Sequence, residues 1–235
     1  MVRRGLARSR SEAQHLIASG KVVVAGANRL KPATFVTSDT PIELEDAEKF
    51  ASRAGEKLAA ALDKFEIEVR GKTALDAGAS TGGFTDCLLQ RGAARVVAVD
   101  VGRDQLRTEL RADPRVRVFE GLDIRNATPS LLGGPFDPVV ADLSFVSLCA
   151  AAPALSALAD DQGDVVLLVK PQFEVGRELV GRGVVSDSGL RRAAVEKVTL
   201  CLAASGMDTL SVMESPVTGE KGNQEYLLWA TKVPS

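Results

Sequence analysis

The chain has 235 residues, of which 45% are apolar and 26% are charged. These values are typical of a globular protein with one α/β domain and a small accessory domain, and they exclude a disordered, collagen-like or coiled-coil chain. No apolar run approaches the roughly 20 residues that span a bilayer. No apolar segment follows the first residues, as a secretory signal would require. We therefore expect a cytoplasmic protein that does not enter a membrane.

The first 35 residues form a basic segment in an otherwise acidic chain. They contain seven Lys and Arg against one acid, Glu12, whereas the whole chain has a net charge of −2. A short basic module can bind a polyanion by neutralising its phosphates, which favours nucleic-acid binding over the alternative of a solvated basic surface. The residues that we expect to contact RNA in this segment are Arg3, Arg4, Arg8, Arg10, Lys21 and Lys31.

The predicted elements of this segment are few. Residues 11–19 form a short helix that Ser11 can cap and that ends at Gly20. A strand at 21–25 and a turn at 26–28 follow, and a second strand covers 42–44. We expect residues 1–46 to form one small domain and residues 47–235 to form a larger one.

The larger domain is predicted to be of the α/β class. Its first helix covers residues 52–65, because Leu58, Ala61, Leu62 and Phe65 recur at helical spacing. Strands are then predicted at 73–76, 95–100, 116–119, 138–142, 164–170, 209–213 and 226–230, and helices at 84–91, 104–111, 148–158 and 190–204. Apolar strands that alternate with helices indicate a mostly parallel sheet covered on both faces.

Four of the predicted strands end in one ionisable residue each: Asp76, Asp100, Asp142 and Lys170. Because ligands of open α/β sheets bind beyond the carboxyl ends of the strands, these side chains indicate a site at one sheet edge. Helix capping and loop solvation are the structural alternative for the carboxylates. For Lys170 and Asp142, the alternative is a simple ion pair at the sheet edge.

A glycine-rich turn, Asp76-Ala-Gly78-Ala-Ser80-Thr-Gly82-Gly83, follows the first of these strands. It matches neither the dinucleotide pattern nor the phosphate-binding loop of nucleoside triphosphatases. A ligand with an adenosine and an amino-acid end, but no phosphate, fits better. Asp100 ends the next strand, where a carboxylate can accept hydrogen bonds from ribose hydroxyls.

Histidine and cysteine usage narrows the chemistry further. His15 is the only histidine and it lies in the basic segment, which excludes a Ser-His-Asp or Cys-His mechanism and a histidine-rich metal site in the larger domain. Cys87, Cys149 and Cys201 are odd in number and far apart in sequence. We interpret them as buried thiols of a reduced compartment, and not as a disulfide or metal framework.

Several motifs together resemble the TlyA family of ribosomal RNA 2′-O-methyltransferases, often called haemolysin A, over nearly the whole chain. They are Arg3-Arg4-Gly-Leu-Ala-Arg-Ser-Arg10, Ser19-Gly-Lys-Val22, Lys31-Pro-Ala-Thr34, Leu75-Asp-Ala-Gly-Ala-Ser-Thr-Gly-Gly-Phe-Thr85, Ala141-Asp-Leu-Ser-Phe145, Lys170-Pro-Gln-Phe-Glu174 and Gly222-Asn-Gln-Glu-Tyr226. The resemblance implies a Rossmann-like, FtsJ-type methyltransferase domain with a mostly parallel seven-stranded sheet. It also implies a small RNA-binding domain like that of ribosomal protein S-four, which is expected to be truncated at its start.

The resemblance also implies a cofactor and residue roles. The family's Lys-Asp-Lys-Glu tetrad corresponds to Lys57, Asp142, Lys170 and Glu225, with Lys170 as the central residue beside the ribose 2′-hydroxyl. The cofactor implied is S-adenosyl-L-methionine. The residues expected to bind it are Asp76, Gly78, Ala79, Ser80, Gly82, Asp100, Asp123 and Phe145. No metal is expected.

The substrate implied is a cytidine of ribosomal RNA, with ribosomal subunits as partners. Arg177 and Arg182 lie in a glycine-rich stretch after Lys170 and are candidates for phosphate contacts, with an ordinary solvated loop as the alternative. Three other functions stay open: a non-catalytic RNA-binding factor, a haemolysin-like membrane-active protein and an NAD-dependent oxidoreductase. The oligomeric state and the modified nucleotide are also open.

Overall fold

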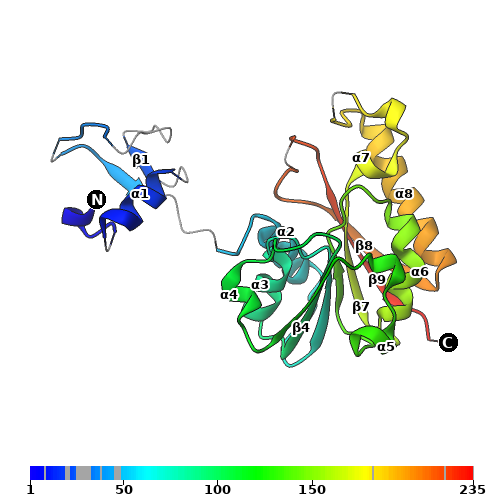
Figure 1. Ribbon diagram of the computed structural model, residues 1–235. Helices are drawn as coiled ribbons and strands as arrows, with labels where there is room; N and C mark the ends of the chain where they lie inside the picture. Colours follow the sequence, from blue (N-terminus) through cyan, green and yellow to red (C-terminus); the bar gives the residue numbers. More distant parts are fainter. Residues whose placement is uncertain are drawn as a thin grey trace. The chain divides into compact units, whose positions relative to one another are not determined.

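The computed structural model describes residues 1–7, 9–18, 22–24, 33–37, 39–44, 49–181, 183–219 and 221–234. They fall into two compact units, Met1–Lys49 and Phe50–Ser235, which we treat separately (Figure 1). The predicted boundary between residues 46 and 47 lies outside the described residues and stays a prediction.

The small unit contains the predicted helix and both predicted strands. A 3-10 turn, η1 (Val2–Arg4), precedes α1 (Arg10–Ala18), and β1 (Val22–Val24) pairs antiparallel with β2 (Ile42–Leu44). The Arg4 guanidinium donates hydrogen bonds to the carbonyls of Thr37 and Thr40, at 2.7 Å each. The turn predicted at residues 26–28 lies outside the described residues.

The large unit is built on a seven-stranded sheet with the order β5-β4-β3-β6-β7-β9-β8. Its strands are β3 (Thr73–Ala77), β4 (Arg95–Asp100), β5 (Val116–Glu120), β6 (Val139–Ala141), β7 (Asp164–Val169), β8 (Met207–Glu214) and β9 (Tyr226–Lys232). The first five strands of the order run parallel, and β9 pairs antiparallel with β7 and β8. The predicted mostly parallel, seven-stranded sheet is therefore confirmed.

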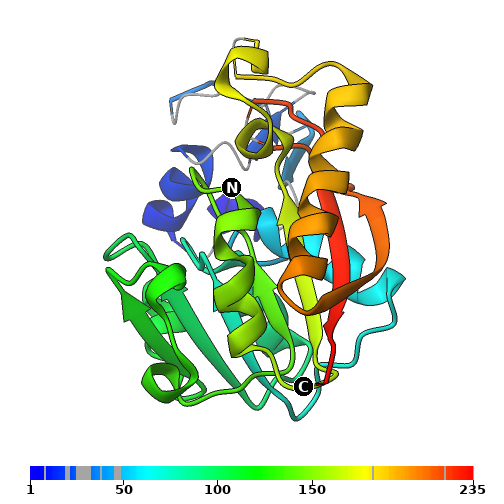
Figure 2. The ribbon, with the colours of Figure 1, turned by 90° about the vertical axis from the view of Figure 1, so that its right-hand side faces the viewer.

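Helices cover both faces of this sheet (Figure 1). On one face α2 (Ala54–Lys64) and α3 (Gly83–Gln90) pack against alternate residues of the strands. On the other, α6 (Leu148–Leu158) and α8 (Ser188–Ala204) do the same, and Figure 2 looks onto this layer. Helix α2 forms as predicted, because the stripe of Leu58, Ala61, Leu62 and Phe65 is buried along one side of it.

Shorter elements fill the connections, and most of them were not predicted. They are α4 (Thr108–Arg111), η2 (Ile124–Asn126), α5 (Pro129–Leu132), α7 (Pro171–Glu174) and η3 (Arg177–Leu179). The helix predicted over residues 104–111 is wrong in its first half. Asp104 has a φ of 56°, which is left-handed backbone, so the helix begins only at Thr108.

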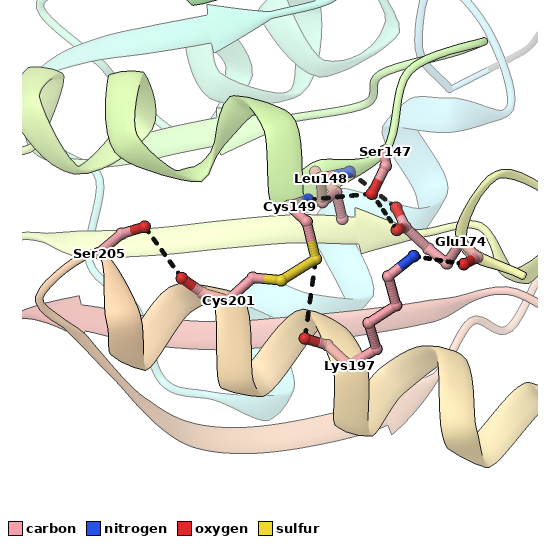
Figure 3. The surroundings of a disulfide bond; sticks show 7 residues. All are labelled: Ser147, Leu148, Cys149, Glu174, Lys197, Cys201 and Ser205. Atoms are coloured by element: carbon pink, nitrogen blue, oxygen red, sulfur yellow. Dashed lines mark hydrogen bonds between the residues drawn. A yellow bond between two sulfur atoms is a disulfide. The ribbon is translucent and has the colours of Figure 1, made fainter.

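The interpretation of the cysteines is also wrong for two of the three. Cys149 of α6 and Cys201 of α8 form a disulfide (Figure 3). Cys87 is a buried thiol outside this bond, as expected. The two helices pack side by side and bring the Cα atoms to 5.1 Å, although 52 residues separate the cysteines in sequence. Sequence spacing alone cannot show that two distant helix positions meet.

Two features are absent from the described residues. Among these residues there is no helix long and apolar enough to cross a membrane. Within the same part of the chain, no group of three or more His, Cys, Asp or Glu side chains could hold a metal ion.

Candidate active site

The carboxyl ends of the parallel strands bring the predicted residues to one edge of the sheet. After β3 the chain turns back tightly, and the amides of Gly78 and Ala79 both donate to the carbonyl of Val99 on β4. Gly78 has a φ of +85°, and a Cβ there would lie 2.5 Å from the carbonyl oxygen of Asp142. A side chain at Gly78 is therefore excluded by both the backbone conformation and the approach of the β6 end.

One pocket of about 450 Å³ lies beyond the ends of β3 and β4, and we call it the Asp100 pocket. The Asp100 carboxylate accepts hydrogen bonds from the amides of Ser80 (2.7 Å) and Gly102 (2.6 Å). Because a carboxylate offers about four acceptor positions, lone pairs remain for a ligand. The predicted cofactor residues that line this pocket are Gly78, Ser80, Asp100, Asp123 and Phe145.

Asp123 also lines the Asp100 pocket. It caps η2 by accepting from the Arg125 amide, and it forms an ion pair with the Arg125 guanidinium at 2.5 Å. The hydrogen bonds from the Arg125 side chain and amide lower the pKa of Asp123. The carboxylate is therefore held ionised and oriented at the pocket wall.

A second pocket, of about 570 Å³, lies beyond the ends of β6 and β7, and we call it the Lys170 pocket. All four residues of the predicted tetrad line it: Lys57, Asp142, Lys170 and Glu225. The two pockets share Gly78, Ser80, Asp142, Ser144 and Phe145 in their walls. They therefore adjoin at the ends of β3 and β6.

The tetrad is organised as two ion pairs. Lys57 of α2 and Glu225, directly before β9, are buried at 8% and 2% exposure and their charged atoms lie 2.5 Å apart. Lys170 Nζ lies 2.6 Å from Asp142 Oδ1, and it donates a directed hydrogen bond of 2.8 Å to Ser144 Oγ. The Asp142 oxygen lacks hydrogen-bond geometry toward any described group, so its contact with Lys170 is electrostatic.

Asp76 lies beneath the turn and lines neither pocket. It is fully buried and accepts a 2.6 Å hydrogen bond from Thr85 Oγ1, while its other oxygen has no hydrogen-bond partner among the described residues. Burial, together with the nearby charges of Asp142 and Asp100, raises the pKa of Asp76 to about 7. Gly82, with a φ of +99°, also stands outside both linings, whereas Ala79 lines the Lys170 pocket.

Phe145 is 92% exposed and lies in the walls of both pockets. Its φ of 65° is unusual for a residue other than glycine. The ring centroid lies 5.3 Å from that of Phe173, and Lys170 Nζ lies 5.8 Å from the Phe173 ring. An aromatic surface of this kind at a pocket mouth can stack on a planar ligand.

Three residues of the site were not assigned a role from sequence: Ser144, Phe173 and Asn223. The Asn223 side chain accepts from the Val185 amide (2.9 Å) and donates to the Gly183 carbonyl (2.8 Å), so it joins two walls of the Lys170 pocket. All three stand within motifs already quoted for the family resemblance. Their nearness to Asp142, Lys170 and Glu225 in sequence was the available signal.

The predicted RNA contacts are only partly described. Arg3 and Arg4 belong to η1 and Arg10 begins α1, and all three side chains are exposed. Arg177 begins η3. Arg8, Lys21, Lys31 and Arg182 lie outside the described residues.

The fold and the two adjoining pockets define the class of protein. An S-adenosylmethionine-dependent methyltransferase from Mesorhizobium loti has a similar fold, with a TM-score of 0.55 at 18% identity over 74% of this chain and 96% of that chain. This likeness shows a Rossmann-like methyltransferase fold and no more.

Closer comparisons are more specific. The FtsJ-like methyltransferase family matches residues 50–232, and the S4 domain matches residues 1–42. The 16S/23S rRNA (cytidine-2′-O)-methyltransferase TlyA of Mycobacterium tuberculosis is 51% identical over 232 residues, 97% of this chain and 87% of that protein. Hemolysin A of Brachyspira hyodysenteriae is 39% identical over 225 residues, 95% and 94% of the two chains. A solved structure described as "Putative hemolysin from Streptococcus thermophilus" gives a TM-score of 0.80 at 39% identity and covers 98% of this chain and 85% of that chain.

The chain belongs to the TlyA family of FtsJ-like methyltransferases. This confirms the family indicated by the motifs, the Rossmann-like fold and the presence of an S4 domain at the start of the chain. It also removes the NAD-dependent oxidoreductase alternative.

Proposed function

We propose that the protein transfers a methyl group from S-adenosylmethionine to the ribose 2′-hydroxyl of a cytidine in ribosomal RNA. The observation that carries this proposal is the position of the Lys170–Asp142 pair where the Asp100 and Lys170 pockets adjoin. A methyl donor in one pocket and a ribose in the other would meet beside this pair. The relative from Mycobacterium tuberculosis is named for cytidine 2′-O-methylation of 16S and 23S rRNA, which supports the choice of substrate.

The Asp100 pocket suits the adenosine part of the cofactor. The Asp100 carboxylate is fixed by two amides and can accept from ribose hydroxyls, as strand-end carboxylates do in related folds. Because Gly78 has no side chain, the turn can approach the Asp142 backbone without a steric clash. Asp123 and Phe145 would contact the adenine or the methionine part, and Ala79 and Ser80 would line the same ligand. When bound, the cofactor supplies an electrophilic methyl group on a sulfonium.

The residues of the Lys170 pocket would then prepare the acceptor oxygen. A ribose hydroxyl is a weak nucleophile at neutral pH, because its proton is held tightly. Lys170 would stabilise negative charge that develops on the oxygen, and Asp142 and Ser144 hold the lysine in place. Much of the rate would come from holding the oxygen in line with the methyl carbon. Lys57 and Glu225 would close the far side of the pocket.

The small unit would supply the affinity for RNA. Its family match is the S4 domain, and its exposed arginines can neutralise phosphates without reading a sequence. Arg8, Lys21 and Lys31 of the same basic segment, and Arg177 and Arg182 of the large unit, are further candidates for phosphate contacts. A substrate within ribosomal subunits implies a cytoplasmic enzyme.

Two measurements test the proposal. Calorimetry with S-adenosylmethionine should give saturable binding by the native protein, and Asp100→Ala should weaken it by at least about tenfold, because one hydrogen-bonded charged contact is worth roughly 1.5–3 kcal/mol. Label from the methyl group should also appear on ribosomal RNA. No binding, or binding without transfer to RNA under any condition that keeps the subunits intact, would contradict the proposal.

A further inference from the structure

Glu174 is a buried carboxylate to which neither the sequence motifs nor the proposed chemistry gives a role. It ends α7 and is 4% exposed. Its Oε2 accepts from Ser147 Oγ at 2.5 Å, and its Oε1 accepts from the Leu148 amide at 2.7 Å (Figure 3). We call Glu174, Ser147 and Leu148 the Glu174 clamp.

The clamp joins α7 to the first turn of α6. Ser147 caps α6 by accepting from the Cys149 amide, and the carboxylate adds a negative charge at this helix end. A buried carboxylate is costly without donors, and here two donors and the helix dipole offset that cost. The Glu174 carbonyl in turn accepts from Lys197 Nζ of α8 at 2.7 Å. Glu174 is thus held from two helices.

The same two segments carry the reactive pair. Residues 142–147 lead from β6 to α6 and contain Asp142, Ser144 and Phe145, whereas residues 170–174 lead from β7 through α7 and contain Lys170 and Phe173. At the strand ends, the Lys170 amine joins the segments through Asp142 and Ser144. At the helix ends, the Glu174 clamp joins them again. Between these two ties, the Phe145 and Phe173 rings lie 5.3 Å apart.

We propose that Glu174 is a positioning residue for methyl transfer, which fixes the β6–α6 segment against α7 and so sets the place of Lys170 relative to Asp142 and Ser144. This inference rests on the proposed function. Glu174 does not line either pocket, so it acts through Lys170 and not on a ligand. A displacement of about 1 Å at a reacting group can cost on the order of 100-fold in rate.

A role in stability alone predicts a different outcome. If Glu174 only caps α6, its loss lowers the melting temperature but leaves the turnover of folded protein unchanged. If it positions Lys170, its loss lowers kcat of fully folded protein. The affinity for S-adenosylmethionine should change little, because Asp100 ends β4 and Asp123 caps η2, outside the two segments that the Glu174 clamp joins. The comparison of kcat with cofactor affinity therefore separates the two roles.

The experiment uses the full chain and four variants at a temperature where all are folded. Glu174→Ala is expected to lower kcat by on the order of tenfold or more, with the Kd for S-adenosylmethionine within about threefold of native. Glu174→Gln should restore kcat to within about threefold, because its amide oxygen can accept from Leu148 and its amide nitrogen can donate to Ser147. Ser147→Ala should fall between these two, since it removes one of the two bonds.

Thr128→Ala is the matched control, because Thr128 caps α5 through the Leu131 amide and lines neither pocket. It should lower the melting temperature and leave kcat unchanged. If the native protein does not transfer the methyl group, the proposed function itself is refuted. An active native protein whose Glu174→Ala form keeps native kcat refutes the positioning role. If Glu174→Ala does not fold, the decision passes to Ser147→Ala, and native kcat in that variant refutes the role in the same way.

Discussion

The two ion pairs of the Lys170 pocket differ in what surrounds them. Lys57 and Glu225 lie 2.5 Å apart with side chains only 10% and 3% exposed, so each charge is almost wholly committed to the other. Lys170 and Asp142 have side chains 12% and 18% exposed, and the lysine is shared with Ser144. Both pairs line the Lys170 pocket, but only the second pair includes a residue, Asp142, that also lines the Asp100 pocket. From this difference we propose that the Lys57–Glu225 pair stabilises the fold and that the Lys170–Asp142 pair acts on substrate.

The largest expected effect comes from the Lys170–Asp142 pair. Lys170→Ala should lower the single-turnover rate of methyl transfer by roughly 10²–10⁴-fold, the range typical of a lost acid–base or charge-stabilising group. The melting temperature and cofactor binding should stay near native, because Lys170 contributes to the wall of the Lys170 pocket only. A rate within threefold of native would assign the chemistry to another residue.

Loss of the Lys57–Glu225 pair should lower the stability of the fold. Glu225→Ala leaves a buried ammonium unpaired, so the free energy of unfolding should fall by about 3–5 kcal/mol, measured by urea denaturation. The double variant Lys57→Met/Glu225→Leu removes both charges and should recover much of this loss. If the single variant is as stable as native protein, the contrast between the two pairs is wrong.

Asp76 extends the comparison, because it is a buried carboxyl group at the same sheet edge with no cationic partner among the described residues. Burial raises its pKa to about 7, well above the ordinary value of an aspartate, so near pH 5 to 6 the native state binds a proton that the unfolded state has lost. Stability should therefore fall as pH rises from about 4 to about 7, by at most about 4 kcal/mol from this group.

The matched variant is Asp76→Asn, which keeps an acceptor for Thr85 but does not titrate. Its stability relative to native protein should increase between pH 5 and pH 8 in urea denaturation. A constant difference across this range would show that Asp76 is ionised throughout.

Loss of the disulfide should affect the two ion pairs least, because the bond joins α6 to α8 in the helix layer and contacts neither pair. Cys201→Ser should lower the free energy of unfolding by roughly 2–4 kcal/mol, the typical contribution of a disulfide. Denatured protein should show one reactive thiol, Cys87, without reductant and three with it. Three thiols in unreduced protein would contradict the bond. Since disulfides are rare in the cytosol, this titration also tests the expected compartment.

Much of the large unit could be predicted from sequence, because its central strands are apolar on both faces and have charged residues at or next to their ends. The alternation of strands and helices that starts at Thr73 predicts the parallel sheet, and the four charged strand ends predict which edge of the sheet carries the site. Pairing within the tetrad could not be predicted this way. Lys57 and Glu225 are 168 residues apart, and only the packing of α2 beside β9 brings them together.

Three other features of the large unit could not be predicted from the sequence pattern. The short helices α5 and α7 have four residues each, too few for a periodic pattern to show. Cys149 and Cys201 meet only because α6 and α8 are neighbours. Glu174 belongs to one of the family motifs, but the role proposed for it depends on contacts with Ser147 and Leu148, which follow a different strand.

The most direct measurement identifies the methylated atom. Ribosomal subunits would be incubated with the protein and methyl-labelled S-adenosylmethionine, and the RNA would then be digested to nucleosides and resolved by mass spectrometry. We expect label in 2′-O-methylcytidine with native protein and none with Lys170→Ala. Label on a base, or label in 2′-O-methylcytidine that persists without Lys170, would contradict the claim that the Lys170–Asp142 pair activates a ribose hydroxyl.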